Sequence, residues 1–452
     1  MKIIRSLCTL LFGVAVLLFF GLAYPHHLHY QEQYQLFLFD CNYVWEIVKL
    51  PGGVADLLGR FCTQFFLFAW VGAFVIAVLL SLVQLLMLRL AKWEWLYGLS
   101  FVPSFLLWLF LLDENALLGG VWAVLFYLLA AWVCTNLPKC WMQVTMIIIA
   151  VPVLYWMASP FGHYYRYPSE TPWLFWTAVL STIIISLAAY GCRHKTSASI
   201  RPAVTLLSFV LVAIVMGIFV WKNSNFKAEK VMHYDFMARH QQWNRILETI
   251  NTEKPNNQIG VTVQNLALGM HGMLIEHLFE YNQNGLLGLL PDVGTDAISP
   301  LPTAEAFYQL GMINIAYRTV FEAQEAILDF QKSARCYKRL AQINLINGSY
   351  EVAHKYLSAL QKTLFYKEWA NETLPLLGDE EAIAKHPEYG HLRKMAYNKD
   401  FYFGDHVTAE MLEDLYRSNE DNRLAYQYLI AYYMLTGDRE RYAKFLHQTE
   451  KQ

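Results

Sequence analysis

Seven long apolar segments occupy the first half of the chain, and polar helical patterns without strand-like runs occupy the second half. Each apolar segment is long enough, or nearly so, to cross a hydrocarbon core of about 30 Å as a helix, the form that satisfies backbone amides in lipid. We therefore predict an all-α protein, with a seven-span bundle over residues 1–221 and a soluble helical domain over residues 222–452. The predicted spans are residues 3–24, 63–88, 95–112, 117–135, 141–157, 173–189 and 204–221.

Basic residues between the apolar segments predict the orientation in the membrane, because short cytoplasmic loops are enriched in Lys and Arg. With the N-terminus in the cytoplasm, the inner loops hold eight such residues and the outer loops hold three. We therefore expect a multi-pass protein of the bacterial inner membrane whose C-terminal domain is periplasmic. The inner residues are Lys2, Arg5, Arg89, Lys92, Lys139, Arg193, Lys195 and Arg201, and the outer ones are Lys49, Arg60 and Arg166.

A polar but strongly aromatic loop, residues 25–62, joins the first two predicted spans. Tyr30–Val48 contains no Gly or Pro and has apolar residues at helical spacing, so we predict one amphipathic helix in the membrane interface. Pro51-Gly52-Gly53 breaks this pattern, and Ala55–Cys62 predicts a second short helix. The apolar face of the first helix holds Tyr34, Phe37, Leu38, Cys41, Val44, Trp45 and Val48.

Two carboxylates of this loop, Glu32 and Asp40, are the candidate catalytic residues. On a continuous helix, residues eight apart lie within about 80° of each other, so both side chains can face one cavity. Either can serve as a general base or bind a divalent cation, and the alternative is a solvated polar face. His26, His27 and His29 lack a carboxylate at a fixed spacing, so we predict no metal site and, unless the protein is a transferase, no cofactor.

Acidic residues favour the predicted outer side, where seven lie against one on the inner side. Solvation of the longer outer loops explains this bias, and convergence of carboxylates at the mouth of the bundle is the alternative. One outer loop, residues 159–173, contains our candidate binding residues, His163 and Arg166. Arg166 can hold a phosphate through its guanidinium fork, or the loop can be an aromatic belt. The outer acidic residues are Glu32, Asp40, Glu46, Asp56, Asp113, Glu114 and Glu170.

The charge of the second half argues against a nucleic-acid partner, and the cysteine spacing argues against two metal-binding or redox motifs. Residues 222–452 contain 24 basic and 29 acidic side chains, whereas a nucleic-acid partner requires a basic footprint. The seven cysteines include no C-x-x-C pair, which argues against a zinc ribbon or a thioredoxin-like motif. Cys41 and Cys62 flank the end of the 25–62 loop, where they either form a disulfide on an oxidising side or remain free thiols.

The clearest pattern in the second half is Tyr337–Lys362, which resembles a tetratricopeptide repeat (TPR). Ala341 and Ala353 occupy the small positions where the two helices of a repeat approach, and Gly348 occupies the turn between them. The resemblance implies an α-solenoid that presents a surface to a peptide or protein partner. Weaker copies are Tyr426–Leu446, with Gly437 at the turn, and Met232–Ile250.

The order of parts in residues 1–221 resembles the shared module of the GT-C superfamily of lipid-linked glycosyltransferases. In that superfamily about seven spans are joined by a first outer loop with interfacial helices, and a catalytic carboxylate lies early in that loop. The resemblance assigns this role to Glu32, or else to Asp40, although the family's acidic pair is absent here. The whole chain also resembles an uncharacterised family of bacterial multi-pass membrane proteins, through the segments QEQYQLFLF and PGGVADLLGRF.

These patterns support two functions. The first is a non-enzymatic membrane anchor that displays the repeat domain to a periplasmic or envelope protein in cell-envelope biogenesis. The second is a GT-C-like glycosyltransferase that uses a lipid-linked sugar on the outer face, with a carboxylate of the first outer loop as catalytic base. Both hypotheses place the chain in the lipid bilayer, and neither involves nucleic acid.

Overall fold

The computed structural model describes residues 2–91, 97–159, 172–191, 202–292, 300–327, 331–397 and 408–449. Within these ranges all regular structure is helical and no strand occurs, so the predicted all-α class is confirmed. The chain divides into two compact units, Met1–Glu229 and Lys230–Gln452, which are described separately below as unit 1 and unit 2.

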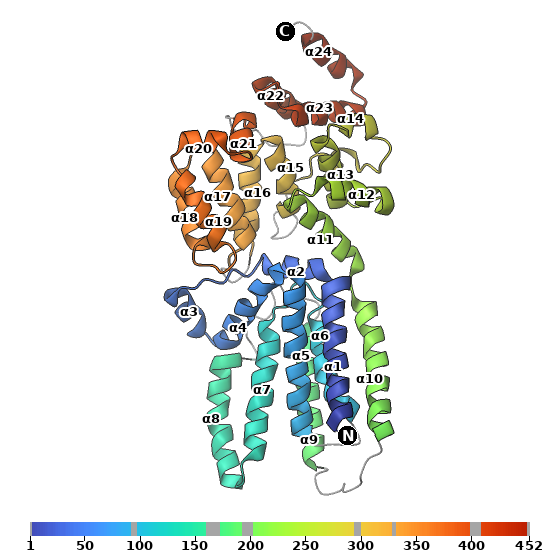
Figure 1. Ribbon diagram of the computed structural model, residues 1–452, viewed down its shortest axis with the longest axis vertical. Coiled ribbons are helices and arrows are strands. Elements are labelled where there is room, and N and C mark those ends of the chain that lie inside the picture. Colours follow the sequence, from blue (N-terminus) through green and yellow to red (C-terminus); the bar gives the residue numbers. More distant parts are fainter. Residues whose placement is uncertain are drawn as a thin grey trace. The chain divides into compact units, whose positions relative to one another are not determined.

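Unit 1 contains the long apolar helices, several of which lie side by side in the lower part of Figure 1. Short helical segments extend or connect them: η1 (Phe19–Ala23) is a π-helix, whereas η2 (Gln64–Leu67) and η3 (Tyr97–Phe101) are 3₁₀ helices. The α-helices are α1 (Lys2–Leu18), α2 (Pro25–Glu32), α3 (Cys41–Val48), α4 (Gly53–Thr63), α5 (Ala69–Ala91), α6 (Val102–Phe110), α7 (Gly119–Asn136), α8 (Cys140–Ala158), α9 (Pro172–Gly191), α10 (Pro202–Asn223) and α11 (Phe226–Arg239), the last of which continues into unit 2.

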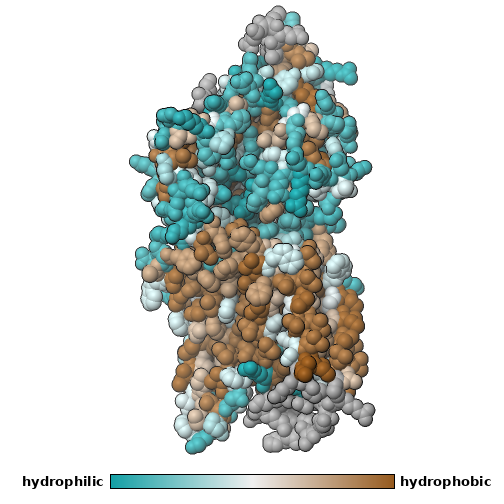
Figure 2. Space-filling model, in the orientation of Figure 1, coloured by the Kyte–Doolittle hydropathy of each residue, from teal (hydrophilic) through white to brown (hydrophobic). Residues whose placement is uncertain are grey.

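Five helical segments of the described residues are long and apolar enough to cross a membrane. Two shorter apolar helices, Tyr97–Phe110 and Trp173–Ala188, take the places of the third and sixth predicted spans, so the number seven stays a prediction. Exposed Leu, Ile, Val and Trp side chains cover much of the long helices, visible as the brown surface of unit 1 in Figure 2. The five segments are Ile3–Ala23, Ala69–Leu90, Gly119–Asn136, Cys140–Ala158 and Ala203–Asn223.

A polar network lies inside this bundle, among α1, α5 and η3. The fully buried Gln84 accepts a hydrogen bond from the hydroxyl of Thr9 at 2.9 Å and donates one to Ser100 at 3.0 Å. The hydroxyl of Tyr97 donates to the backbone carbonyl of Arg5 at 2.9 Å. Hydrogen bonds between helices in membrane bundles contribute only about 0.6 kcal/mol each on average, so the network mainly fixes the register of α1 against α5.

Two glycines allow α4 and α7 to approach closely. A Cβ atom added to Gly59 would lie only 2.4 Å from the backbone nitrogen of Gly119, far inside van der Waals contact. By contrast, a Cβ added to Gly217 on α10 would meet no atom within 4 Å. The close crossing of α4 and α7 therefore depends on the missing side chain of Gly59.

Unit 2 is built from shorter helices that mostly contact their neighbours in sequence, as in the runs α15–α16–α17–α18 and α22–α23–α24 (Figure 1). Its regular elements besides α11 are α12 (Trp243–Glu253), α13 (Gln258–Met270), α14 (Leu274–His277), η4 (Gly285–Gly288), α15 (Pro300–Leu310), α16 (Ile313–Glu325), α17 (Ala334–Ile346), α18 (Tyr350–Leu360), α19 (Lys367–Thr373), η6 (Leu374–Leu376), α20 (Glu380–Lys385), α21 (Tyr389–Met395), α22 (Thr408–Ser418), α23 (Arg423–Thr436) and α24 (Arg439–Thr449).

The predicted unit Tyr337–Lys362 forms two helices joined by a tight turn. Gly348 lies in that turn with a φ of +77°, a left-handed conformation that glycine adopts without steric cost. Ala341 of α17 and Ala353 of α18 are both fully buried, as expected for residues at a close helix crossing. The helix–turn–helix expected at this position is therefore present.

Two further helix pairs occur where weaker copies are predicted. In the first, Gly437 has a φ of +69° and ends α23 before α24 begins. In the second, Gln241 has a φ of +53° in the turn between α11 and α12, a conformation that is uncommon for a residue with a side chain. The absence of glycine at this turn is one reason that the second copy is faint in the sequence.

Candidate functional site

The loop between the first two apolar helices does not form the single long helix predicted for Tyr30–Val48. Helix α2 ends at Glu32, residues 35–40 have no regular structure, and α3 begins at Cys41. The prediction is wrong because local hydrogen bonds compete with the helical pattern. The carboxylate of Asp40 accepts from the backbone amides of Asn42 at 2.9 Å and Tyr43 at 3.2 Å, which makes it the N-cap of α3.

This break separates the two candidate catalytic carboxylates. Asp40 has an extended backbone, so it does not share a helix with Glu32, and the expected angular relationship between them does not exist. Glu32 is only 3% exposed at the end of α2, and its sequence neighbours Gln31, Gln33 and Gln35 are buried as well. The structure thus gives Asp40 a local capping role and buries Glu32.

The hinge between α3 and α4 forms at the predicted Pro-Gly-Gly sequence. Gly52 has a φ of +80° and caps α4, and a Cβ on Gly53 would lie 2.0 Å from the carbonyl oxygen of Ile47. Helix α8 holds this turn from the side. The amide of Gly52 donates to the carbonyl of Trp156 at 2.8 Å, and the Trp156 indole donates to the carbonyl of Val48 at 2.8 Å.

The outward face of α3 is apolar, as predicted for an interfacial helix. Trp45 is 65% exposed, and Cys41, Val44 and Val48 follow it around the same face of the helix. With Phe37, Phe39 and Asp40 of the preceding segment, these residues line an open groove of about 470 Å³. This exposed apolar surface suits contact with lipid at the headgroup boundary.

Two of the three histidines of α2 contact protein backbone, and the ring of the third, His26, lies 5.7 Å from the ring of His29. His27 is fully buried, with its Nε2 atom 2.9 Å from the carbonyl oxygen of Leu111. The Nδ1 atom of His29 lies 3.1 Å from the carbonyl oxygen of Phe66. Among the described residues no group of three or more His, Cys, Asp or Glu side chains is arranged to hold a metal ion.

A carboxylate that the sequence did not single out, Glu229 of α11, completes the N-terminus of α2. Its two carboxylate oxygens accept hydrogen bonds from the backbone amides of His26 at 2.7 Å and His27 at 2.9 Å. Burial raises the pKa of Glu229 to about 7, while the two amide hydrogen bonds act in the opposite direction. No sequence motif marks this residue, because its partners lie about 200 positions earlier in the chain.

Several other carboxylates of the predicted outer loops have local partners. Asp56 binds Arg60 one turn later on α4, Glu46 binds Lys49, and a carboxylate oxygen of Asp113 accepts from the amide of Asn115 at 2.9 Å. These contacts favour the simpler explanation of the predicted outer acidic bias, in which each carboxylate is bound within its own loop and does not converge with the others on one site.

The candidate binding residues His163 and Arg166 lie outside the described residues. Cys41 and Cys62 are both free.

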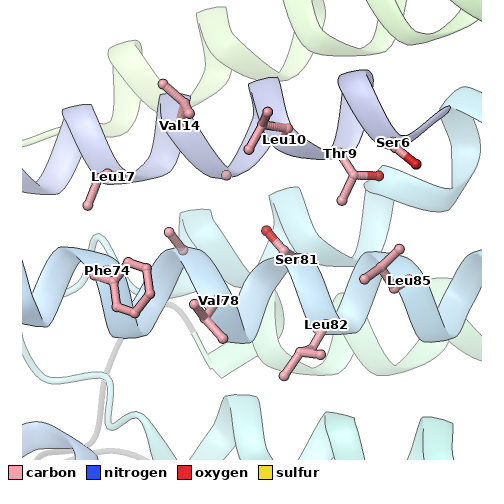
Figure 3. Close-up of a pocket in the computed structure, with 12 residues that line it drawn as sticks. Ser6, Thr9, Leu10, Val14, Leu17, Phe74, Val78, Ser81, Leu82 and Leu85 are labelled. Atoms are coloured by element: carbon pink, nitrogen blue, oxygen red, sulfur yellow. The ribbon is translucent and has the colours of Figure 1, made fainter. Parts of the chain in front are cut away.

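A second concave surface of unit 1 is an apolar groove of about 530 Å³ between α1 and α5 (Figure 3). Small residues, Gly13 on α1 and Ser81 on α5, open the groove, because a Cβ on Gly13 would lie 3.1 Å from the Ser81 hydroxyl oxygen. Leu10, Val14 and other aliphatic side chains form its walls. This surface is suited to hydrocarbon and offers few groups for polar chemistry.

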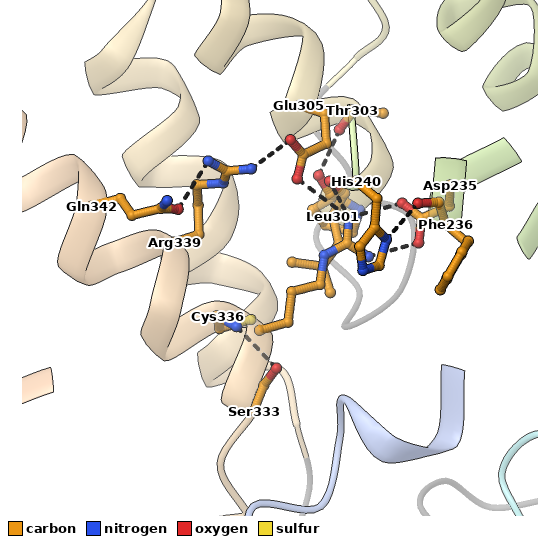
Figure 4. Close-up of polar contacts among 12 residues, drawn as sticks. Asp235, Phe236, His240, Leu301, Thr303, Glu305, Ser333, Cys336, Arg339 and Gln342 are labelled. Carbon is orange, nitrogen blue, oxygen red and sulfur yellow. Dashed lines mark hydrogen bonds and ion pairs between the residues drawn. The ribbon is translucent and has the colours of Figure 1, made fainter. Parts of the chain in front are cut away.

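A highly charged cavity lies in unit 2, where α11, α15 and α17 meet (Figure 4). Arg335 of α17 donates two hydrogen bonds to Asp235 of α11, at 2.7 Å and 2.8 Å, and lies 3.5 Å from a carboxylate oxygen of Glu305. Arg339 donates to the other oxygen of Glu305 at 2.6 Å. Both arginines and Glu305 are largely buried, so these ion pairs form a desolvated centre of the domain.

The charges of this centre shift the pKa of Glu305. Burial alone would raise the pKa of Glu305, but the charges of Arg339 and Arg335 lower it overall. Arg339 also stacks over the ring of Tyr308 at 3.8 Å, and the Tyr308 hydroxyl donates to Glu388 at 2.9 Å. Sequence analysis did not single out this site, although Arg335, Lys338 and Arg339 show the spacing of residues on one helix face.

A family model described as a family of unknown function (DUF6057) matches residues 1–452. The chain belongs to this family. The match confirms the predicted resemblance of the whole chain to an uncharacterised family. No curated protein and no solved structure matches the chain. The GT-C and tetratricopeptide resemblances stay predictions, and membership of DUF6057 assigns no activity.

Proposed function

We propose that this protein is a multi-pass protein of the bacterial inner membrane whose C-terminal helical domain binds a protein partner in cell-envelope biogenesis. The observation that carries the proposal is a partly exposed aromatic surface on consecutive helices of unit 2. Tyr317 and Phe321 of α16 stack with ring centroids 6.0 Å apart, and Phe321 is 41% exposed. Tyr337 of α17 and Tyr356 of α18 make an edge-to-face pair at 5.1 Å.

These four residues, named here the aromatic surface, lie on three successive helices. The two aromatic pairs lie near each other, because, besides burial, the charge of ionised Tyr317 helps to raise the pKa of Tyr356. Aromatic residues supply much of the binding energy at protein interfaces because they bury a large area at a low entropic cost. A run of stacked helix pairs commonly presents such a surface to a peptide or protein, in line with the TPR-like pattern.

The proposal includes the topology that the charge pattern predicts. Seven spans with a cytoplasmic N-terminus would place the helical domain in the periplasm, and the five long apolar helices support a membrane location. The exposed apolar face of α3, with Trp45 at its centre, supports a first outer loop that lies in the membrane interface.

Site-specific photocrosslinking in living cells tests the proposal. A photoreactive amino acid replaces Phe321 in the full-length protein, and a matched variant carries it at Lys444, an exposed residue of α24 outside the aromatic surface. We expect a crosslinked adduct of one defined mass from position 321 that weakens when Tyr356→Ala is added. Absence of an adduct at 321, or an equal set of adducts at 321 and 444, would contradict the proposal.

The burial of Glu32 favours a second candidate function, a GT-C-like transferase that uses a lipid-linked sugar with Glu32 as catalytic base. A carboxylate that is 3% exposed has the low-dielectric environment in which a general base is tuned. Glu32→Gln should then abolish the cellular phenotype at unchanged membrane levels of protein. Asp40→Asn should have little effect, because asparagine also caps a helix. A normal phenotype of Glu32→Gln would exclude this candidate.

A further inference from the structure

The charged cavity of unit 2 carries more positive than negative side chains on its walls. Its volume is about 170 Å³, and it is lined by four cationic residues but only two carboxylates. The carboxylates are Glu305 and Glu388, and the cationic residues are Arg239, Arg335, Lys338 and Arg339. His240, Gln241 and Gln342 complete the walls with neutral hydrogen-bonding groups.

The cationic residues fall into two groups according to their partners. Arg335 and Arg339 are engaged by carboxylates at 2.7 Å and 2.6 Å and act as structural ion pairs. Arg239 and Lys338, within the described part of the chain, have no carboxylate within 4 Å. Arg239 donates to the hydroxyl of Tyr366 at 3.3 Å, and the Lys338 ammonium lies 4.9 Å from the centre of the Trp369 ring. The positive charges of Arg239 and Lys338 are therefore not neutralised by an adjacent carboxylate.

The position of these cations on α17 is electrostatically unfavourable in the free protein. Arg335 lies in the first turn of α17, where the helix dipole favours negative charge. Burial, together with the nearby charges of Arg239 and Arg339, lowers the pKa of Lys338 to about 8, against smaller opposing effects of Glu388 and Glu305. An arrangement that costs stability in this way is typical of a functional site.

We propose that this cavity binds a phosphate group, with Arg239 and Lys338 as its charged ligands. A phosphate monoester carries between one and two negative charges near pH 7, which matches two cations that lack a carboxylate partner. A carboxylate group would neutralise only one of them. The cavity offers the space of roughly six water molecules by liquid volume, which is enough for a tetrahedral phosphate group.

The cavity walls hold groups that can donate hydrogen bonds to phosphate oxygens. An arginine fork recognises phosphate oxygens in pairs, and a lysine acts on them as a point charge. The amide of Gln342, whose oxygen accepts from Arg339 at 3.0 Å, adds an NH₂ group as a neutral donor at the cavity wall. Desolvation within the cavity strengthens each of these interactions relative to water.

Isothermal titration calorimetry on the detergent-solubilised full-length protein tests this site at constant ionic strength. The probes are inorganic phosphate, glycerol 3-phosphate and acetate. The variants are Arg239→Gln and Lys338→Gln, and the matched control is Lys355→Gln on the exposed face of α18. Thermal unfolding of each variant, measured without phosphate, shows that the protein remains folded.

We expect saturable binding of phosphate that each cavity variant weakens at least tenfold and that Lys355→Gln leaves unchanged. Tighter binding of glycerol 3-phosphate would identify a phosphomonoester, and equal binding would identify phosphate itself; both outcomes support the site. Acetate binding as tight as phosphate binding would overturn the assignment. Unchanged phosphate affinity in folded Arg239→Gln and Lys338→Gln proteins would also overturn it. The result is independent of the crosslinking test of the aromatic surface.

Discussion

Arg335 donates two hydrogen bonds to Asp235 and so connects α17 to α11 across 100 residues of sequence. The side chain of Arg335 is 5% exposed and that of Asp235 is 14% exposed, so solvent screens this ion pair weakly. A buried pair adds little stability over an apolar pair of the same shape, but loss of one partner leaves an uncompensated charge. The pair therefore fixes how α11 joins the rest of unit 2.

Asp235→Asn should destabilise unit 2 because Arg335 would lose one of its buried carboxylate partners. We expect a loss of about 3 kcal/mol, near the lower end of the cost of breaking buried pairs. Chemical denaturation of the detergent-solubilised protein measures this change. The control is Glu381→Gln, which removes an exposed pair with Lys385 and should cost less than about 0.5 kcal/mol. Equal effects of the two substitutions would contradict a buried role for Asp235.

The stability of unit 1 should fall as the pH rises through the range in which Glu229 ionises. The folded pKa of about 7 lies above the ordinary value of 4.5, so the folded state binds this proton more tightly than the unfolded state. The contribution of Glu229 is therefore fully present below pH 4.5 and is lost as the pH approaches 7. The cost is up to about 3 kcal/mol. Thermal unfolding at several pH values should show this loss, and Glu229→Gln should reduce it.

Phosphate binding to the unit 2 cavity should weaken above pH 8, where Lys338 loses its proton. Its charge is opposed by Arg239 and Arg339 and supported by Glu388 and Glu305, with the Trp369 ring beside it. Because burial and like charges lower the pKa of Lys338 to about 8, the ammonium form is present at pH 7 and largely absent at pH 9. Calorimetry at both values should show a larger loss of affinity for the wild type than for Lys338→Gln.

Gly59→Ala should disrupt the crossing of α4 and α7. The added Cβ would lie 2.4 Å from the backbone nitrogen of Gly119, so one helix must move. Overpacking of this kind costs about 1–3 kcal/mol. Size-exclusion chromatography after heating should show loss of folded protein at a lower temperature than for the wild type. Gly217→Ala is the matched control, since its Cβ would meet no atom within 4 Å, and it should behave as wild type.

Sequence patterns predicted most of the helices because these depend on local signals. The apolar runs found the long helices, and Gly348 and Gly437 marked turns whose left-handed conformation requires a small residue. The long helix across Tyr30–Val48 was wrong for a reason that periodicity does not contain. Asp40 caps α3 with its own side chain, and this hydrogen bonding competes with a continuous helix.

The candidate site was less predictable because its residues come together from distant parts of the chain. Glu229 and His26 are separated by 203 positions, and Arg335 and Asp235 by 100, so no motif spacing joins them. The run Arg335, Lys338 and Arg339 was visible in the sequence, but a basic helix face is usually solvated. Only the fold shows that Arg335 and Arg339 of this face lie against the buried carboxylate of Glu305.

The hydrogen bonds from α2 to Glu229 have a consequence for the order in which the protein is made. At a synthesis rate of about 5–20 residues per second, Glu229 leaves the ribosome roughly 10–40 s after His26. Trp156, which holds the hinge at Gly52, also follows the loop by more than 100 residues. Residues 25–62 therefore lack part of their native contacts while the later helices are synthesised, and truncation before Glu229 would remove the acceptor for the first two amides of α2.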